Sequence, residues 1–480
     1  MLHENFIKIN DYLWEAPKSL RNEMRVPARV YISEDMKKDT EEEAFQQLIN
    51  LTTLPGIVKY SLAMPDIHTG YASPIGGVAA LDAKEGVISP GLCGYDINCG
   101  MRLLKSNYTL EEIRPQLDKI ASKIQREIPS GLGKGRGQSM KFSLTDIDKI
   151  LAGGAQWLVE QGYGEKEDLD NCEANGRLEW AQVKAVSLLA KQRGQDQVGT
   201  LGSGNHFLEI QKVAEIFDEE TAKIFGLFPN QVVIMIHTGS RGLGHQVCTD
   251  YLKLMVEAMN RYGIKVPDRE LACVPFTSQE GQDYFGAMAG AANFAWANRQ
   301  LITYFIKKVW KETFGQQAQL TSLYDVAHNI IKREKYSIGG EEKELLVHRK
   351  GATRAFPPNH LEISEKYKLS GQPVLIPGSM GTSSYILKGV ATGEQSFYST
   401  CHGSGRIMSR HAAIRVLDPY EIVNNMRKKG IIVKVWSLKG LTEEAPQAYK
   451  NIDEVVGVVH KAGLSLKVAK LIPLAVIKGE

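Results

Sequence analysis

The sequence has few cysteines, and no two of them form a Cys-x-x-Cys pair. The six are spread along a chain of 480 residues: Cys93, Cys99, Cys172, Cys248, Cys273 and Cys401. In a chain of this length such a pattern does not suit a disulfide framework, so we expect a reducing compartment. The N-terminus also lacks the basic and then apolar pattern of a secretion signal. The sequence therefore predicts a cytoplasmic protein.

Long apolar runs and a strong net charge are also missing. No apolar run approaches the roughly 18–20 residues of a membrane-spanning helix, so we expect no membrane segment. The net charge is +3, so a nucleic-acid partner would need a local basic patch. No repeat, low-complexity segment or linker divides the chain. These absences favour one large domain over residues 1–480.

Two well-known catalytic signatures do not occur. The His-Glu-x-x-His pattern of metalloproteases is absent. The Lys-x-Asp-Gly signature of ligases that use a nucleophilic lysine is absent too, because the chain contains no Asp-Gly pair. If the protein transfers nucleotides, its nucleophile is not that lysine.

What is present is a run of small residues around one histidine, Cys401-His402-Gly403-Ser404-Gly405-Arg406. The two glycines let the backbone approach a ligand and point N–H groups at it, which suits a phosphate. Arg406 can add a bidentate contact. A neutral imidazole at His402 is then placed to attack a phosphorus atom. The alternative is a glycine-rich turn whose histidine only packs nearby.

A second candidate site lies in the turn between Gly94 and Gly100. There Asp96 and Cys99 stand three residues apart and could hold one metal ion with an oxygen and a sulfur atom. The alternative is a polar turn with a buried free cysteine, which is common.

Three histidines complete the set of candidate metal ligands, and each neighbours a Gly, Asn or Thr in a separate loop: His206, His237 and His328. Five ligands suit one crowded site, or two sites that share a ligand such as the cysteine sulfur. Mixed O, N and S donors fit Zn, Mn, Fe or Co and argue against Mg or Ca. Among the other histidines, His68 beside Asp66 has the best setting. The alternative for His237 is a histidine satisfied at the end of a strand.

The patterns of apolar residues predict both helices and strands. Apolar spacing predicts helices over 109–128, with a capping box at its start, and over 283–314. Glycine and proline predict short strands over 57–104, and a buried strand covers 231–236. The glycine-rich loop 131–137 is basic and is a candidate phosphate contact, with a plain mobile loop as the alternative. This mixture predicts an α+β protein.

Six motifs, in order, resemble the RtcB-type RNA ligases, also called tRNA-splicing ligases. The resemblance runs from about residue 57 to Lys478-Gly479. The motifs are Asp96-Ile97-Asn98-Cys99-Gly100, Gly204-Asn205-His206-Phe207-Leu208-Glu209, His237-Thr238-Gly239-Ser240-Arg241, Ala327-His328-Asn329, Pro377-Gly378-Ser379-Met380-Gly381-Thr382 and His402-Gly403-Ser404-Gly405-Arg406. The resemblance implies an α+β fold, a single domain of stacked β-sheets surrounded by helices.

The resemblance also implies a reaction in tRNA splicing and RNA repair. An RNA ending in a 3′-phosphate or 2′,3′-cyclic phosphate is joined to an RNA with a 5′-hydroxyl, using GTP and manganese. His402 attacks the α-phosphorus of GTP and forms a histidine–GMP intermediate. A cyclic end is first opened, GMP passes to the 3′-phosphate, and the 5′-hydroxyl displaces GMP. RNA is the expected partner, and an archease-type activating protein is a second candidate.

The family pattern assigns roles to residues of this chain. It puts one manganese ion on Cys99, His237 and His328, and a second on Asp96, Cys99 and His206. It implies that GMP contacts Asn205, Phe207, Glu209, Asn329, Pro377, Gly378, Ser379, Met380, Ser384, Gly403, Ser404, Gly405, Tyr449 and Lys478. Our candidates for contacts with RNA phosphates are Arg241, Arg406 and Arg410.

Two other functions compete with ligation. A dinuclear metal-dependent phosphodiesterase would use the same ligands without a covalent nucleotide, and His402 would then act as a general acid. A non-catalytic RNA-binding or chaperone-like protein would not need five convergent ligands, and removing the metal would leave its binding intact. A covalent GMP adduct separates the ligase from both.

Overall fold

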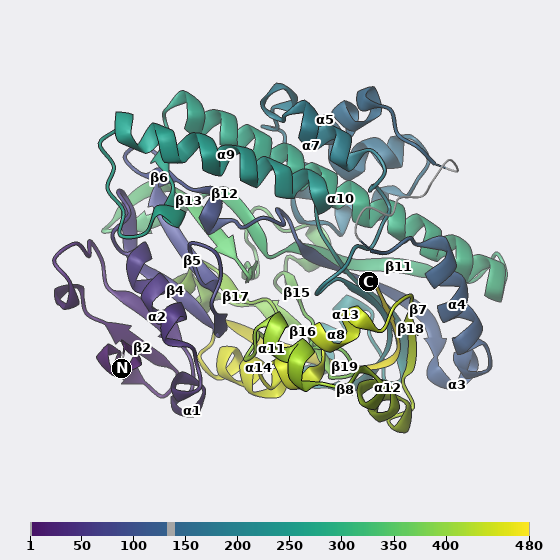
Figure 1. Ribbon diagram of the computed structural model, residues 1–480. Helices are drawn as coiled ribbons and strands as arrows, with labels where there is room; N and C mark the ends of the chain where they lie inside the picture. Colours follow the sequence, from purple (N-terminus) through teal and green to yellow (C-terminus); the bar gives the residue numbers. More distant parts are fainter. Residues whose placement is uncertain (1, 132–139, 480) are drawn as a thin grey trace.

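Two large β-sheets organise the computed structural model, which describes residues 2–131 and 140–479 (Figure 1). The first sheet has the strand order β1-β2-β3-β4-β5-β13-β12. Its strands are β1 (Ile7–Asn10), β2 (Leu13–Ala16), β3 (Ala28–Tyr31), β4 (Ile57–His68), β5 (Ile75–Asp82), β12 (Asn329–Ile338) and β13 (Glu341–Lys350). Most of the basic loop 131–137 lies outside the described residues.

The second sheet has the order β11-β7-β9-β8-β19-β16-β15, with β18 beside β19. Its strands are β7 (Gly100–Thr109), β8 (Phe207–Ile216), β9 (Gln231–Thr238), β11 (Leu320–Ala327), β15 (Pro373–Ile376), β16 (Ser384–Gly389), β18 (Ile432–Val435) and β19 (Ser465–Lys478). Two short pairs join β6 (Val87–Ile88) to β10 (Val274–Pro275) and β14 (Ala352–Arg354) to β17 (Ser399–Cys401).

Helices surround the sheets, and Figure 1 shows α5, α9 and α10 along one side of the molecule. The helices are α1 (Glu34–Lys38), α2 (Glu42–Leu51), α3 (Leu110–Ile113), α4 (Leu117–Glu127), α5 (Leu144–Glu160), α6 (Lys166–Asp170), α7 (Leu188–Gly194), α8 (Glu219–Phe225), α9 (Arg241–Arg261), α10 (Gln279–Phe314), α11 (Arg410–Val416), α12 (Pro419–Lys428), α13 (Lys439–Glu443) and α14 (Ile452–Lys461). Within the described ranges, no helix is both long and apolar enough to cross a membrane.

The core explains the apolar run 232–236 in the middle of β9. All eight of its residues are buried, because it lies between β7 and β8 and both of its faces are covered. Ile234 and Ile236 pack in the cluster that holds α9 and α10, whereas Val233 and Met235 pack in the cluster on the opposite face. Alternate residues of a strand point to opposite faces, so a strand covered on both sides needs an unbroken apolar run.

The two sheets also share apolar contacts, in a core cluster to which α2 and α14 contribute. Val78 and Ala80 of β5 lie in one core cluster with Val374 and Ile376 of β15. The sheets are therefore stacked, and helices enclose them. The predicted α+β fold is confirmed in this form. One domain over residues 1–480 stays a prediction, which the mixing of distant strands in both sheets supports.

Two predicted elements differ in detail. The helix over 109–128 has its capping box at Thr109 and Glu112, but a 3₁₀ turn, Arg114–Gln116, interrupts it because Pro115 has no backbone N–H to donate. The prediction of only short strands over 57–104 is wrong, because β4 spans 12 residues. Pro65 is tolerated there because strand pairing is irregular between Ala63 and His68.

Candidate metal centre and nucleophile

The predicted metal ligands lie at the ends of four neighbouring strands. Cys99 precedes β7, His206 precedes β8, His237 is the penultimate residue of β9, and His328 follows β11. These strands are antiparallel neighbours, and their registers place Gly100 opposite both Thr238 and Ala327. Phe207 is likewise paired with His237. The sheet therefore gathers side chains from four distant parts of the chain at one edge.

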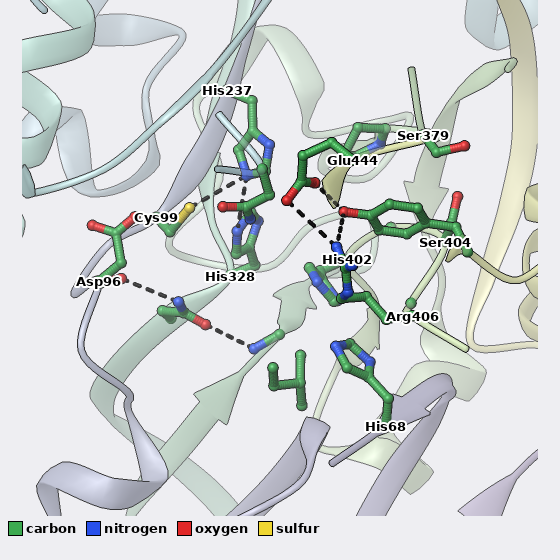
Figure 2. A pocket seen from close by; sticks show the side chains of 18 of the residues that line it. His68, Asp96, Cys99, His237, His328, Ser379, His402, Ser404, Arg406 and Glu444 are labelled. Atoms are coloured by element: carbon green, nitrogen blue, oxygen red, sulfur yellow. Dashed lines mark hydrogen bonds and ion pairs between the residues drawn. The ribbon is translucent and has the colours of Figure 1, made fainter. Parts of the chain in front are cut away.

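The ligand atoms converge closely. Cys99 Sγ lies 3.3 Å from His237 Nε2 and 3.5 Å from His206 Nε2. His237 Nε2 is 3.4 Å from His328 Nε2, and Asp96 Oδ2 is 2.8 Å from His206 Nε2. Figure 2 shows Cys99, His237 and His328 pointing toward one another. All five predicted ligands are thus brought together.

These atoms form two groups that share one residue. Cys99, His237 and His328 are one group, and Asp96, Cys99 and His206 are the other; within each group the ligand atoms lie within 4.8 Å of one another. The sulfur of Cys99 belongs to both, as the family pattern implies. The arrangement therefore has room for two ions with a shared thiolate.

The chemistry of the donors fits metal ions. His237 and His328 are buried, and burial holds the pKa of each imidazole well below its usual range. Their neutral rings offer lone pairs to the same point, an arrangement that a cation between them would stabilise. Burial also raises the pKa of the Cys99 thiol, so a thiolate there needs a positive charge beside it.

Asp96 is held as a carboxylate. Burial tends to raise its pKa, but the charge and hydrogen bond of His206 outweigh burial and lower the pKa to about 2. The backbone N–H of Ser240 donates to Asp96 Oδ1 at 3.0 Å and fixes the other oxygen. Oδ2 is thereby aimed at the metal group.

A buried arginine ties the ligand-bearing segments together. Arg299 of α10 donates from Nη1 to the carbonyls of Asn98 (2.9 Å) and Thr238 (2.8 Å). Its Nη2 pairs with Asp325 at 2.8 Å. Asn98 and Thr238 adjoin the ligands Cys99 and His237, so Arg299 fixes the backbone next to both. We did not predict this role; its signal in the sequence is a polar run, 298–300, inside an apolar helix.

His402 is oriented by a carboxylate from the first sheet. Asp66 of β4 lies with Oδ2 2.5 Å from His402 Nδ1 and 2.9 Å from the His402 backbone nitrogen. The Gly403 N–H donates to the same oxygen at 3.3 Å. Because two backbone N–H groups already donate to this oxygen, it acts as an acceptor and Nδ1 carries the proton. The lone pair of His402 is therefore on Nε2.

The sequence did not predict this role for Asp66. Its neighbour His68 was the remaining histidine with the best setting, but His68 Nδ1 contacts the Asp66 carbonyl at 2.8 Å. Burial lowers the pKa of His68 to about 3. The aspartate, rather than the histidine, is the residue of this pair that contacts the predicted nucleophile.

The glycines after His402 permit a close approach of two segments. Gly405 has φ +71°, and a Cβ there would lie 2.3 Å from the Asp66 carbonyl oxygen. Ser404 Oγ is buried and has no hydrogen-bond partner within residues 2–131 and 140–479. A buried hydroxyl without a partner is costly, so this atom is suited to a ligand that supplies the missing bond.

One cavity of about 470 Å³ joins these features. This is within the usual range for a small-molecule site. His402 and four of the metal ligands line it, together with Arg406, Arg410 and twelve of the predicted GMP contacts: Asn205, Phe207, Asn329, Pro377, Gly378, Ser379, Met380, Gly403, Ser404, Gly405, Tyr449 and Lys478. The nucleophile, the metal groups and most of the predicted nucleotide contacts therefore face one space.

Known proteins resemble this chain over most of its length. The family model described as tRNA-splicing ligase RtcB matches residues 47–479. A protein named tRNA-splicing ligase RtcB from Thermococcus kodakarensis is 51% identical over 98% of both chains. Its namesake from Archaeoglobus fulgidus is 52% identical over the same shares. A protein named RNA-splicing ligase RtcB from Mycobacterium tuberculosis is 49% identical over 90% of this chain and 100% of its own.

The chain belongs to the RtcB family. Membership confirms the family predicted from the six motifs, and with it the enzyme class of RNA ligases. The family match begins at residue 47, somewhat before the resemblance that starts near residue 57. The roles of individual residues stay predictions that rest on the geometry.

Glu209 and Ser384, two GMP contacts implied by the RtcB pattern, are not among the residues that line the cavity. Gln211 Nε2 donates to Glu209 Oε2 at 2.7 Å and to Ser384 Oγ at 3.0 Å. The Gly378 N–H donates to the same Ser384 hydroxyl at 3.2 Å. Burial raises the pKa of Glu209 to about 8. In this structure both side chains brace the segments that line the cavity.

The three arginines predicted to contact RNA have different surroundings. Arg406 donates from Nη1 to the Tyr449 hydroxyl at 2.9 Å and pairs with Glu444 at 3.4 Å. Arg410 lies at the mouth of the cavity with a side chain that is 53% exposed. Arg241 is buried and donates to the Thr200 hydroxyl at 3.2 Å. Of the three, Arg410 is the one open to solvent.

Glu444 is a further residue that sequence reasoning missed. It is buried, lines the cavity and accepts a hydrogen bond from the Tyr449 hydroxyl. It also pairs with Arg406 (Figure 2). Its carboxylate holds the Arg406 guanidinium at the cavity wall. No motif surrounds Glu444 in the sequence, so only the fold reveals it.

Proposed function

We propose that this RtcB-family protein joins RNA ends with GTP and manganese through a GMP adduct on His402. An RNA with a 3′-phosphate or 2′,3′-cyclic phosphate is joined to one with a 5′-hydroxyl. The observation that carries the proposal is the position of His402. The hydrogen bond from His402 Nδ1 to Asp66 leaves the imidazole lone pair on Nε2. His402 lines the same cavity as residues of both metal-ligand groups.

The first step uses His402 as the nucleophile. Nε2 attacks the α-phosphorus of GTP, an N–P bond forms, the bond to the β-phosphate oxygen breaks, and pyrophosphate leaves. Nδ1 keeps its proton, and the Asp66 carboxylate stabilises the positive charge that develops on the ring. Asp66 is therefore a positioning residue for the nucleophile.

The metal groups would hold two manganese ions. One would lie on Cys99, His237 and His328, and the other on Asp96, Cys99 and His206. Ions bound there would supply positive charge that offsets the charge of the reacting phosphates and favours activation of the attacking oxygens. The protein supplies ligands in fixed positions, and four of them, Cys99, His206, His237 and His328, are buried.

The glycine-rich segment and its neighbours would hold GMP. The unpartnered hydroxyl of Ser404 is suited to accept or donate a bond to the nucleotide. Lys478 Nζ is buried and donates to the Gly204 carbonyl at 2.7 Å, which places its charge at the cavity wall. The Pro377–Met380 loop lines the same space.

The later steps rejoin the RNA. Water opens a cyclic end, breaking the bond to the 2′-oxygen and leaving a 2′-hydroxyl and a 3′-phosphate. A 3′-phosphate oxygen then attacks the GMP phosphorus, and the N–P bond to His402 breaks. The 5′-hydroxyl attacks the 3′-phosphate phosphorus, loses its proton, and GMP leaves. No oxidant or reductant is needed.

The names of the relatives, tRNA-splicing ligase and RNA-splicing ligase, support RNA as the partner in splicing. A role in the repair of cleaved RNA rests on the family resemblance. A cytoplasmic location and an archease-type activating protein belong to the same proposal. They rest on the cysteine pattern and on the family resemblance.

A joining assay tests the proposal. The protein is incubated with manganese, GTP, one RNA with a 3′-phosphate and one with a 5′-hydroxyl. We expect a joined product that requires both metal and GTP, and no product from an RNA with a 3′-hydroxyl. Cleavage of RNA without joining would favour the phosphodiesterase, and metal-independent binding without chemistry would favour the RNA-binding protein.

Replacement of Asp66 by asparagine tests its positioning role. The amide can donate to Nδ1 and leave the proton on Nε2, which removes the nucleophilic lone pair. We expect the rate of GMP adduct formation to fall about 10²–10⁴-fold while GTP binding changes little. Rapid-quench labelling with α-labelled GTP measures the rate.

Asp35→Asn, in the exposed first turn of α1, is the matched control. A thermal melt checks that the buried Asp66 variant remains folded. An adduct rate equal to that of the wild type would remove Asp66 from the mechanism.

A further inference from the structure

Three ring side chains form part of the cavity wall beside the metal groups. Tyr95 stacks on His245 with ring centroids 4.7 Å apart and an interplanar angle of 26°. Tyr71 lies against Tyr95 at 5.3 Å and 60°. All three line the cavity that contains His402. We call Tyr71, Tyr95 and His245 the aromatic ledge.

The aromatic ledge is rigid on one side and open on the other. Tyr71 and Tyr95 are partly buried and pack against the core cluster that includes α9 and α10. His245, in the first turns of α9, is exposed. Tyr71 and Tyr95 rest on the core and the exposed His245 ring stacks on Tyr95, so the three rings together present an apolar platform to the cavity.

The mechanism proposed above does not use these rings. The predicted GMP contacts come from other segments, chiefly the Pro377–Met380 loop, residues 403–405 and the end of β19. The metal groups use no atom of the ledge. The ledge is therefore a part of the cavity wall that contacts neither GMP nor a metal ion in the proposed reaction.

The chain connects the ledge to both reacting centres. Tyr95 immediately precedes the metal ligand Asp96, and Tyr71 follows Asp66, which holds His402, by five residues. The phosphate that takes GMP from His402 must lie between His402 and the metal groups. The ledge, His402 and residues of both metal groups line the same cavity, so the ledge is a wall that the base of this nucleotide can meet.

We propose that the aromatic ledge stacks on the nucleobase at the phosphate-bearing end of the RNA. The inference rests on the proposed function and adds a base subsite to it. Single-stranded RNA ends are commonly bound by stacking on Tyr, Phe, Trp or His, and every base has a face that can stack. Such a subsite accepts any terminal base, which suits an enzyme that seals ends of different sequence.

The test isolates GMP transfer to the phosphate-bearing strand. Preformed GMP adduct is mixed with an RNA that ends in a 3′-phosphate, without a 5′-hydroxyl partner, and the RNA concentration is varied. For His245→Leu and Tyr95→Leu we expect the half-saturating RNA concentration to rise about 5–100-fold, the usual effect of losing one stacked base. The rate of adduct formation with GTP should stay at the wild-type value.

Two further variants serve as controls. Tyr95→Phe keeps the ring and should behave like the wild type. Tyr420→Leu removes an exposed tyrosine of α12 that does not line the cavity, and it too should have no effect. His245 is exposed, so its replacement should not disturb folding. The His245 variant therefore still tests the ledge if the Tyr95 variant does not fold.

An RNA whose terminal nucleotide lacks its base completes the experiment. The wild type should lose affinity for this RNA by the same factor as the leucine variants lose for the normal RNA. The leucine variants should no longer distinguish the two RNAs. Equal discrimination by wild type and variants would overturn the inference, as would leucine variants with the same half-saturating concentration of 3′-phosphate RNA as the wild type.

A failure of the proposed function would look different. In that case the wild type would form no GMP adduct at all. Binding of the same two RNAs, measured by fluorescence anisotropy with manganese and without GTP, would still test the ledge. No difference between the RNAs in wild-type binding would then reject it.

Discussion

His402→Ala is expected to abolish the GMP adduct that the wild type forms with manganese and α-labelled GTP. Nε2 is the ring nitrogen of His402 with a free lone pair, because Nδ1 carries the proton and donates it in a hydrogen bond to Asp66. Alanine has no nucleophile, so labelling should fall by a factor on the order of 10⁴ or more. Intact mass and gel labelling measure the adduct, and acid should release GMP because the bond is a phosphoramidate.

His411→Ala is the matched control, since His411 is an exposed histidine of α11 that does not line the cavity. It should label as well as the wild type. An adduct that persists in His402→Ala would place the nucleophile elsewhere. No adduct in the wild type, with GTP intact, would favour the dinuclear phosphodiesterase and turn His402 into a general acid or a phosphate contact.

The sequence allowed candidate metal ligands to be chosen because they stand in polar, glycine-containing loops, and the structure places these loops at strand ends. Each of Cys99, His206, His237 and His328 adjoins or ends a strand, and the ends of antiparallel neighbours meet at one sheet edge. The glycines around His402 likewise indicated a backbone that approaches a ligand closely. Local patterns were sufficient where the chemistry depends on a strand end or a turn.

The supporting residues could not be predicted in this way. Asp66 lies inside β4, 336 positions before His402, and only the packing of the two segments brings it to Nδ1. Arg299 lies within α10 and resembles a residue of a packing helix until its contacts with Asn98 and Thr238 are seen. Such partners are fixed by tertiary contacts: Asp66 has no local signal for its role, and the polar run 298–300 around Arg299 does not show what it contacts.

The buried ion pair of Arg299 and Asp325 illustrates the same division. Burying two charges costs several kcal/mol of desolvation, so the pair is a poor source of stability by itself. Its guanidinium also bonds two backbone carbonyls next to metal ligands. We therefore interpret the ion pair as holding the ligand-bearing loops in place rather than as a source of folding free energy.

Cys99→Ala is expected to abolish metal-dependent guanylylation while the protein stays folded. Cys99 is the residue that both metal groups share, so its loss leaves each group with two ligands. Removing one buried –SH group costs about 1–2 kcal/mol of stability, which a protein of this size tolerates. Bound manganese, measured by elemental analysis after desalting, should fall from two ions toward none.

Cys93→Ala separates the role of the shared sulfur from the mere loss of a buried thiol. Cys93 is also buried, lies six residues earlier and belongs to neither metal group. It should keep both ions and full adduct formation. Full activity of Cys99→Ala would reject the bridging role. Retention of one ion with no adduct would show that both metal groups are needed before His402 can react.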